Sequence, residues 1–335
     1  MNATFEKSSK ANIGVDIRIL DLIDFNVESY YDHRYDIMVA DGNITSGFFG
    51  ATASNSPSGI VNNYGVEVGM NVGKQMKDFF FNVNAQLAFA RNKIVNMNEA
   101  FKPYDYLKST GRRLGQFYGL EAIGFFKDQA DIDNSPIQTF STVYPGDLKY
   151  KDQNGDGIIT SEDRTVIGNA LPKWYGGITN TFNYRGIDLS FMFQFNYGND
   201  IYNATRLYAT QTRNGRRNMM AEVADRWSET NASNKVPSVK GYITNDVYSR
   251  FVEDGSFLRL KNVTLGYTLP HKWTKKFYVS KLRVYASGQN LFCINGYSGY
   301  DPEVSTAGSN PMTPGLDWGA YPKSRVFTFG IDLQF

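Results

Sequence analysis

The chain has 335 residues, of which 41% are hydrophobic, and a formal net charge of +2. This length leaves room for a sizeable core, and the near-balanced charge does not favour nucleic acid as a partner. No run of about 18 apolar residues occurs, which excludes a membrane-spanning helix. The single cysteine, Cys293, excludes a disulfide within the chain and a cysteine metal cluster.

Apolar and polar residues alternate over long segments from the start of the chain to its end. In chain order the clearest segments are ANIGVDIRIL at 11–20, NYGVEVGMNVG at 63–73, FFFNVNAQLAFARNK at 79–93, GIDLSFMFQFNYGND at 186–200 and VFTFGIDLQF at 326–335. Weaker alternation occurs at 24–36, 173–186, 260–270 and 281–292. Because successive side chains of a strand point to opposite faces, this pattern predicts about nine β-strands, each with one apolar face.

Two all-β architectures fit these strands. A soluble sandwich also has alternating strands, but they are usually about five or six residues long. The strands here run to about ten residues or more, the length that crosses a bilayer at a tilt, and their polar face suits a wet lumen. We therefore expect an antiparallel transmembrane β-barrel of the outer membrane. The residues expected to face lipid include Ile187, Phe191, Phe193, Phe195, Phe327 and Phe329.

The connections between the strands support the barrel. Short links at 20–24, 73–78 and 184–188 alternate with long ones near 41–62, 95–173, 200–254 and 295–323, and the link at 270–281 is an exception of intermediate length. Outer-membrane barrels have short periplasmic turns and long extracellular loops. The alternation gives an odd number of spans, whereas whole bacterial barrels have an even number, so we expect the chain to be part of a larger barrel.

One long loop contains a possible metal site. The segment DQNGDGIITSED at 152–163 matches the first six positions of a calcium loop, with Gly157 at the sharp turn. The ligands would be Asp152, Asn154, Asp156, the carbonyl of Ile158 and Asp163. The twelfth position, however, is Asp163 instead of Glu, and Glu162 stands one place early. The alternative is a metal-free turn built by Asx side chains and glycines.

The remaining candidates concern substrate and catalysis. Trp318, Tyr297, Tyr300 and Tyr321 are loop aromatics that would contact a sugar, or else pack the loops together. The two histidines, His33 and His271, have no Ser or Cys beside them in a catalytic arrangement, and no carboxylate pair suggests a hydrolase. We therefore expect no enzymatic activity and no required cofactor.

The chain resembles the C-terminal barrel portion of the SusC/RagA family of TonB-linked outer-membrane transporters of Bacteroidetes. The matching stretches are GDLKYKDQNGDGIITSEDRTVIGNALPKWYGGITNTFNYRGIDLSFMFQFNYGNDIYN at 146–203, FVEDGSFLRLKNVTLGYTLP at 251–270, VYASGQNLF at 284–292 and GYDPEVSTAGSNPMTPGLDWGAYPKSRVFTFGIDLQF at 299–335. The segments NIGVDIRIL and ARNKIVNM are similar to earlier barrel strands of the family.

The resemblance implies that residues 1–335 supply about nine strands of a 22-stranded barrel, and that the family's signal peptide, TonB box and plug domain are absent from them. Full members import oligosaccharides or peptides with energy relayed by the TonB complex, and a SusD-like lipoprotein caps the barrel. The implied partners are thus that lipoprotein, the TonB complex through the missing N-terminal part, outer-membrane lipid and the substrate. Two alternatives stay open, a non-functional truncated remnant and a soluble β-rich glycan-binding protein.

Overall fold

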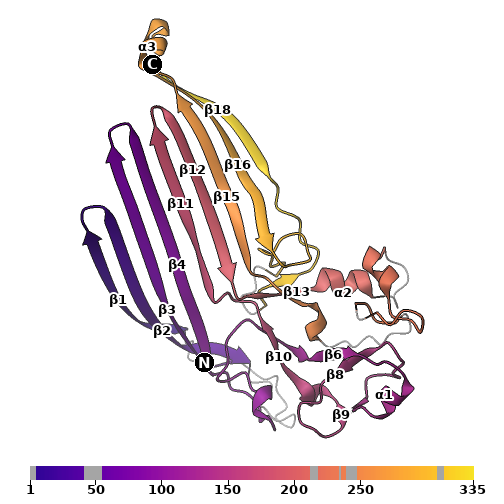
Figure 1. The fold of residues 1–335 in the computed structure, drawn as a ribbon. Coiled ribbons are helices and arrows are strands. Elements are labelled where there is room, and N and C mark those ends of the chain that lie inside the picture. Colours follow the sequence, from indigo (N-terminus) through magenta and orange to yellow (C-terminus); the bar gives the residue numbers. More distant parts are fainter. Residues whose placement is uncertain (1–4, 41–54, 212–217, 234, 239–246, 308–312) are drawn as a thin grey trace.

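The computed structural model describes residues 5–40, 55–211, 218–233, 235–238, 247–307 and 313–335. Nine long strands form one antiparallel sheet in the order β1-β2-β3-β4-β11-β12-β15-β16-β18, so neighbours in the sheet follow chain order (Figure 1). This confirms the predicted strand number and antiparallel arrangement. Among the described residues, no helix has the length and apolar character needed to cross a membrane.

The sheet strands are 9 to 22 residues long. Their bounds are β1 (Lys7–Ile19), β2 (Ile23–Ala40), β3 (Asn55–Met76), β4 (Phe79–Asn96), β11 (Trp174–Tyr184), β12 (Ile187–Tyr197), β15 (Phe257–Thr268), β16 (Lys281–Asn295) and β18 (Val326–Gln334). The loop expected at 41–62 is shorter than predicted. The pairing of β3 with β2 begins at Asn55, opposite Ala40, and passes through Asn62, opposite His33.

Cross-strand pairing gives the sheet one apolar and one polar face. In one row across five strands, Ala85, Ile178, Phe193, Leu260 and Phe292 lie side by side on the apolar face. The adjacent row on the other face contains Gln86, Gly177, Gln194, Arg259 and Cys293. The lipid-facing positions predicted in β12 and β18 all belong to the apolar face, and Phe329 is 81% exposed.

Three tight turns join strands at one end of the sheet. Residues 20–22 link β1 to β2, residues 77–78 link β3 to β4, and residues 185–186 link β11 to β12. Leu20, Lys77 and Arg185 have φ of 52°, 44° and 47°, which closes the hairpins. The fourth connection at this end, between β15 and β16, is longer and contains the helix α3 (His271–Thr274) and the 3-10 helix η6 (Lys275–Phe277).

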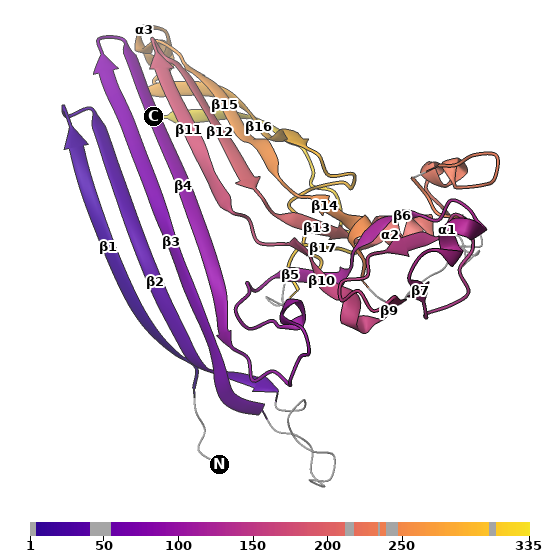
Figure 2. The same ribbon diagram turned by 60° about the horizontal axis from the view of Figure 1, so that its bottom comes forward.

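The long connections gather at the opposite end of the sheet (Figures 1 and 2). We call the described residues of 97–173, 198–256 and 296–325 the loop body. Its elements include β5 (Gln116–Leu120), β6 (Ala122–Phe125), β7 (Ile137–Gln138), β8 (Leu148–Tyr150), β9 (Ile158–Ile159), β10 (Arg164–Asn169), β13 (Asp200–Asn203), β14 (Val252–Asp254), β17 (Leu316–Asp317), α1 (Gln129–Asp133) and α2 (Ala204–Thr210).

The loop body has a hydrophobic core of its own. Its buried members are Leu120, Leu148, Tyr150, Ile159, Tyr202, Ala204, Tyr248 and Phe251. Small sheets tie the segments together, because β13 pairs with β14 on one side and with β17 on the other. The long connections therefore pack against one another into a single structure at the extracellular end of the sheet.

Candidate functional site

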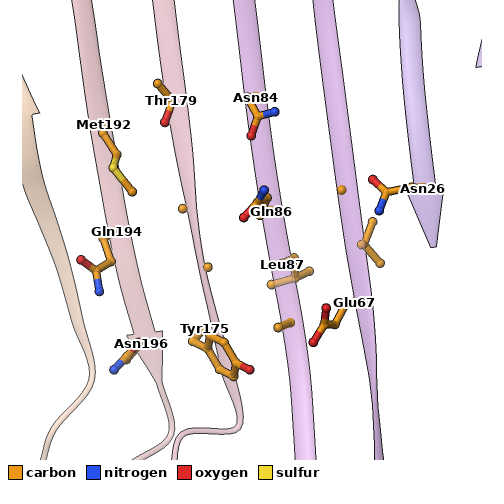
Figure 3. Close-up of a pocket in the computed structure, with 15 residues that line it drawn as sticks. Asn26, Glu67, Asn84, Gln86, Leu87, Tyr175, Thr179, Met192, Gln194 and Asn196 are labelled. Carbon is orange, nitrogen blue, oxygen red and sulfur yellow. The ribbon is translucent and has the colours of Figure 1, made fainter. Parts of the chain in front are cut away.

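A hollow of 650 Å³ lies on the polar face of the sheet (Figure 3). Its lining comes from β2, β3, β4, β11 and β12, and includes Asn26, Glu67, Asn84, Gln86, Tyr175, Thr179, Met192, Gln194 and Asn196. Glu67 is the only charged side chain among the lining residues that the structure describes. The surface therefore offers amide and hydroxyl groups that bind neutral polar partners through hydrogen bonds.

Glycines shape this hollow. Gly69 and Gly177 lie in the same cross-strand row as Gln86, on the polar face. A side chain at Gly69 would meet the Asn26 amide oxygen at 2.1 Å, and one at Gly177 would meet the Phe193 carbonyl oxygen at 2.8 Å. Neither position has room for a side chain, so the two glycines let the Asn26 amide and the β12 backbone lie close against β3 and β11 beneath the hollow.

A second, smaller cavity of 260 Å³ lies in the loop body. Its lining residues are Ala204, Thr205, Tyr208, Ala209, Asn218, Trp318 and Gly319. The rings of Tyr208 and Trp318 meet edge to face with centroids 4.5 Å apart, and Trp318 remains 56% exposed. The cavity thus combines an accessible indole with small side chains and uncharged polar groups.

Hydrogen bonds fix the turn that carries Trp318. The buried carboxylate of Asp317 accepts bonds from the hydroxyls of Thr205 and Tyr297. The Thr205 hydroxyl oxygen also accepts the Gly319 amide at 2.7 Å. Because the partners come from α2 and from residues before β17, the indole is held in place before any ligand arrives.

The four predicted sugar-contact residues do not share one environment. Only Trp318 is among the residues that line the loop-body cavity. Tyr297 is buried, with its hydroxyl bound to Asp317, so its ring serves to hold the loop in this conformation. Tyr300 and Tyr321 are largely exposed. Sugar contact stays a prediction, and Trp318 is the one of the four residues whose position fits it best.

The 152–163 loop is closed by hydrogen bonds from its own backbone. Asp152 accepts the amides of Gly155 and Gly157 at 2.7 and 2.8 Å. Asp163 is fully buried, and its two oxygens accept the amides of Gln153 and Thr160 at 2.8 and 2.7 Å. In the described residues, no three His, Cys, Asp or Glu side chains are grouped as metal ligands would be. The loop has the form of an Asx turn, and calcium binding stays a prediction.

We expect weak calcium binding by this loop, with a Kd of about 10⁻⁴–10⁻³ M, as in extracellular modules. Asp156→Ala removes a carboxylate at the fifth position and should abolish luminescence from bound terbium. The matched control is Glu162→Ala, because Glu162 is exposed and one place away from the twelfth position. Absence of any signal from the unmutated protein at millimolar metal would leave the metal-free turn as the correct interpretation.

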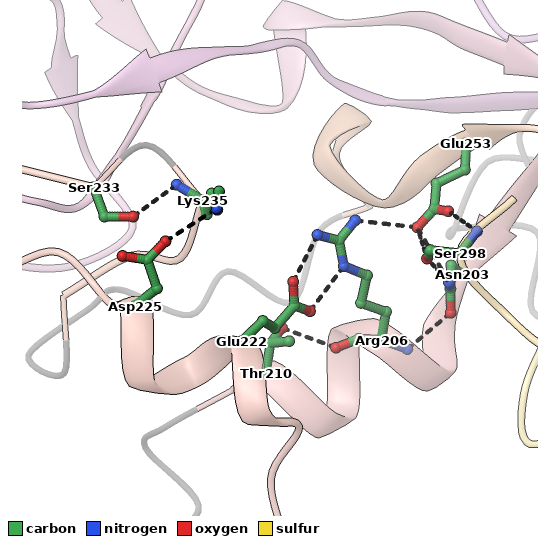
Figure 4. Close-up of polar contacts among 9 residues, drawn as sticks. All are labelled: Asn203, Arg206, Thr210, Glu222, Asp225, Ser233, Lys235, Glu253 and Ser298. Atoms are coloured by element: carbon green, nitrogen blue, oxygen red, sulfur yellow. Dashed lines mark hydrogen bonds and ion pairs between the residues drawn. The ribbon is translucent and has the colours of Figure 1, made fainter. Parts of the chain in front are cut away.

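A polar network around Arg206 links three segments of the loop body (Figure 4). The Arg206 guanidinium donates two bonds of 2.9 Å to Glu222 and a third, of 3.2 Å, to Glu253. Glu253 in turn accepts the amide and hydroxyl of Ser298 and the side-chain amide of Asn203. The hydrogen bond from Arg206 holds the pKa of Glu222 below its usual range. These contacts fix the α2 segment that carries one wall of the Trp318 cavity.

A second network joins the loop body to the sheet. Arg259 of β15 is only 3% exposed, and its guanidinium donates to Asp301 at 2.6 Å. Glu303 lies 3.6 Å from the Arg259 guanidinium and 3.5 Å from the Lys261 ammonium, and also accepts a bond from Lys323. The network was not predicted, since the sequence places Arg259 and Asp301 in segments 42 residues apart.

Taken together, the lipid-compatible apolar face, the polar hollow and the loop body at one end of the strands are typical of a β-barrel protein of the outer membrane. Comparisons with known proteins name the family. The chain is 31% identical over 356 residues to TonB-dependent receptor P26 of Formosa agariphila, and 25% identical over 349 residues to TonB-dependent receptor SusC of Bacteroides thetaiotaomicron. Both alignments cover 100% of this chain, but they cover only 35% of the length of P26 and 32% of the length of SusC. No family model matches the chain.

Solved structures show the same fold. The RagAB peptide importer in its closed-closed state superposes with a TM-score of 0.79 at 21% identity, covering 100% of this chain and 36% of the other. The open-open state gives 0.77 at 22% identity, covering 99% and 35%. The whole chain is thus homologous to a C-terminal part of TonB-dependent receptors of the SusC/RagA family, and it is an outer-membrane protein. It spans about a third of the length of these relatives.

Proposed function

We propose that the chain forms part of an outer-membrane importer that takes up oligosaccharides or peptides. Energy would come from the TonB complex through an N-terminal part, and a SusD-like lipoprotein would close the extracellular side. The relatives support nutrient import, since they are named receptors and an importer. The observation that carries the proposal is the concave polar face, which would form a wall of the passage beneath the loop body.

The exposed apolar face counts against the soluble alternative. A soluble glycan-binding domain would need to cover a surface on which Phe327, Phe329 and Ile331 are each at least 65% exposed. In a bilayer that surface meets lipid, and no cover is needed. The remnant alternative is separated from the importer by measuring uptake.

The test is deletion of the coding region from its chromosome, followed by uptake of labelled oligosaccharides and peptides. We expect loss of uptake for one of these substrate classes, restored by complementation and abolished by a protonophore. Unchanged uptake and growth on every oligosaccharide and peptide supplied would support the remnant instead.

If the substrate is an oligosaccharide, we expect Trp318→Ala to weaken its binding about tenfold, or about 1.4 kcal/mol. The exposed indole would stack on a sugar ring, and truncation removes that contact while the Asp317 anchor stays. Titration calorimetry on the purified protein measures the effect. Phe101→Ala is the matched control, because Phe101 is an exposed aromatic residue of the loop body that does not line the cavity. Equal losses in both variants would contradict a specific role for Trp318.

A further inference from the structure

The connection between β15 and β16 differs from the other turns at its end of the sheet. Those turns have two or three residues, whereas this one runs from Leu269 to Ser280 and contains α3 and η6. In Figure 1, α3 lies beyond the strand ends, beside the C-terminus and away from the loop body. Because short turns mark the periplasmic side, this segment lies at the periplasmic surface of the outer membrane.

Exposed aromatic rings and lysines make up most of this segment. Residues 270–281 read PHKWTKKFYVSK, with four lysines, one histidine and no acidic residue. Trp273 is 53% exposed, Phe277 76% and Tyr278 90%. Three uncovered aromatic rings among cationic side chains are unusual for a surface that only water contacts.

The segment is held in a defined conformation. The Trp273 amide donates to the Pro270 carbonyl at 2.9 Å, and the Ser280 amide donates to the Gln334 carbonyl of β18 at 2.7 Å. Thr274 is buried beneath the turn. Tyr278 adopts the left-handed conformation, with φ of 61°, which favours glycine over a bulky residue. Tyr278 caps the C-terminus of η6 in this conformation, and its ring is left at the surface.

We propose that residues 270–281 are an interfacial anchor that binds the headgroups of anionic phospholipids in the periplasmic leaflet. Tyr184 and Tyr267 end the apolar face at this edge, as in the aromatic girdles of barrels, and the segment begins just beyond them. Trp and Tyr rings settle at the headgroup level of a bilayer. Lysines near the surface are attracted to anionic lipid, while their stems pack against apolar groups.

The nearby charges leave the lysines of this segment available. Asp188 and Asp332 are both bonded to Arg283, at 2.7 and 3.0 Å. Arg185 in the adjacent β11–β12 turn is paired at 2.9 Å with Asp78 of the β3–β4 turn. These three carboxylates thus already bind arginines, and the four lysines of the segment outnumber the one negative charge that two aspartates on a single arginine leave over. The excess positive charge faces outward to an anionic partner.

The experiment uses the protein purified in its assembled form from outer membranes and reconstituted in liposomes. Brominated phosphatidylglycerol or brominated phosphatidylcholine is added in equal amounts, and tryptophan quenching is recorded. The Trp273 signal is the difference between the unmutated protein and Trp273→Phe. The charge variant is Lys272→Gln/Lys275→Gln/Lys276→Gln. Its control is Lys74→Gln/Lys77→Gln, which removes two exposed lysines beside the β3–β4 turn, at the same end of the sheet and separated from the segment by the β11–β12 hairpin.

We expect the phosphatidylglycerol to quench Trp273 several-fold more strongly than the phosphatidylcholine at low salt. The difference should disappear in 1 M salt and in the triple variant, and persist in the Lys74/Lys77 control. Mass spectrometry gives a second measurement, the amount of phosphatidylglycerol that the detergent-purified protein retains. This amount should fall in the triple variant and persist in the Lys74/Lys77 control. It does not depend on the Trp273→Phe variant. Equal quenching by the two lipids, or none by either, would overturn the proposal, and the latter would favour a periplasmic protein as the partner.

Discussion

Phe193→Lys should lower the free energy of unfolding in a bilayer by about 2–4 kcal/mol, as expected for a lysine at the lipid midplane. Phe193 lies on the apolar face of the sixth strand of the sheet, with its ring 6.0 Å from Phe191 and 6.3 Å from Phe292. A lysine there must leave its charge in hydrocarbon or bend its chain toward a headgroup. Urea unfolding of the assembled protein in liposomes measures the loss.

Two controls separate charge from packing. Phe193→Leu loses the aromatic contacts but stays apolar, so it should cost much less than the lysine. Gln194→Lys places the same charge one residue away on the polar face, where the Gln194 amide lies 3.5 Å from Glu303. Equal losses for Phe193→Lys and Gln194→Lys would be incompatible with the assignment of the two faces.

Arg259→Met should destabilise the junction of loop body and sheet by about 3–5 kcal/mol, because it leaves a buried charge without its partner. The Arg259 and Asp301 side chains are only 4% and 10% exposed. Without the guanidinium, Asp301 must either protonate or admit water. Hydrogen exchange of the amides at 296–307 measures the effect, and we expect exchange to speed up there first.

The double variant Arg259→Met/Asp301→Leu tests the cause, since it removes both charges and should recover much of the loss. Lys323→Ala removes a more exposed partner of Glu303, and it should cost about 1 kcal/mol or less. If Arg259→Met and Lys323→Ala speed exchange equally, burial of the arginine pair does not decide the stability of this junction.

The sheet could be predicted from sequence because lipid and water impose a strict alternation. The segment from Ile187 to Tyr197 shows this alternation clearly. Met192 is an apolar residue at a polar position of the pattern, and it lies on the polar face beside Thr179. The start of β3 was missed because its first residues, NSPSGIVN at 55–62, lack a long apolar series. They pair instead through backbone hydrogen bonds with β2, and side-chain patterns do not reveal backbone pairing.

The loop body was much less predictable, because its contacts join residues that are distant in sequence. Tyr297 and Trp318 are both aromatic residues of loops and cannot be told apart by sequence. In the structure Tyr297 is buried and donates a hydrogen bond to Asp317, whereas Trp318 lines a cavity. Arg206 binds Glu222 and Glu253, which lie 16 and 47 residues further along the chain. Local motifs were easier, since the 152–163 turn is closed by residues within the motif itself.

The shared core of the loop body also sets an order of events during folding. The Leu120 amide reaches the Val247 carbonyl, and Tyr202 pairs with Leu316, so each contact spans more than a hundred residues of chain. Such contacts are entropically costly until the intervening strands have brought the segments together. We therefore expect the loop body to close last, after the strands that carry its segments have paired.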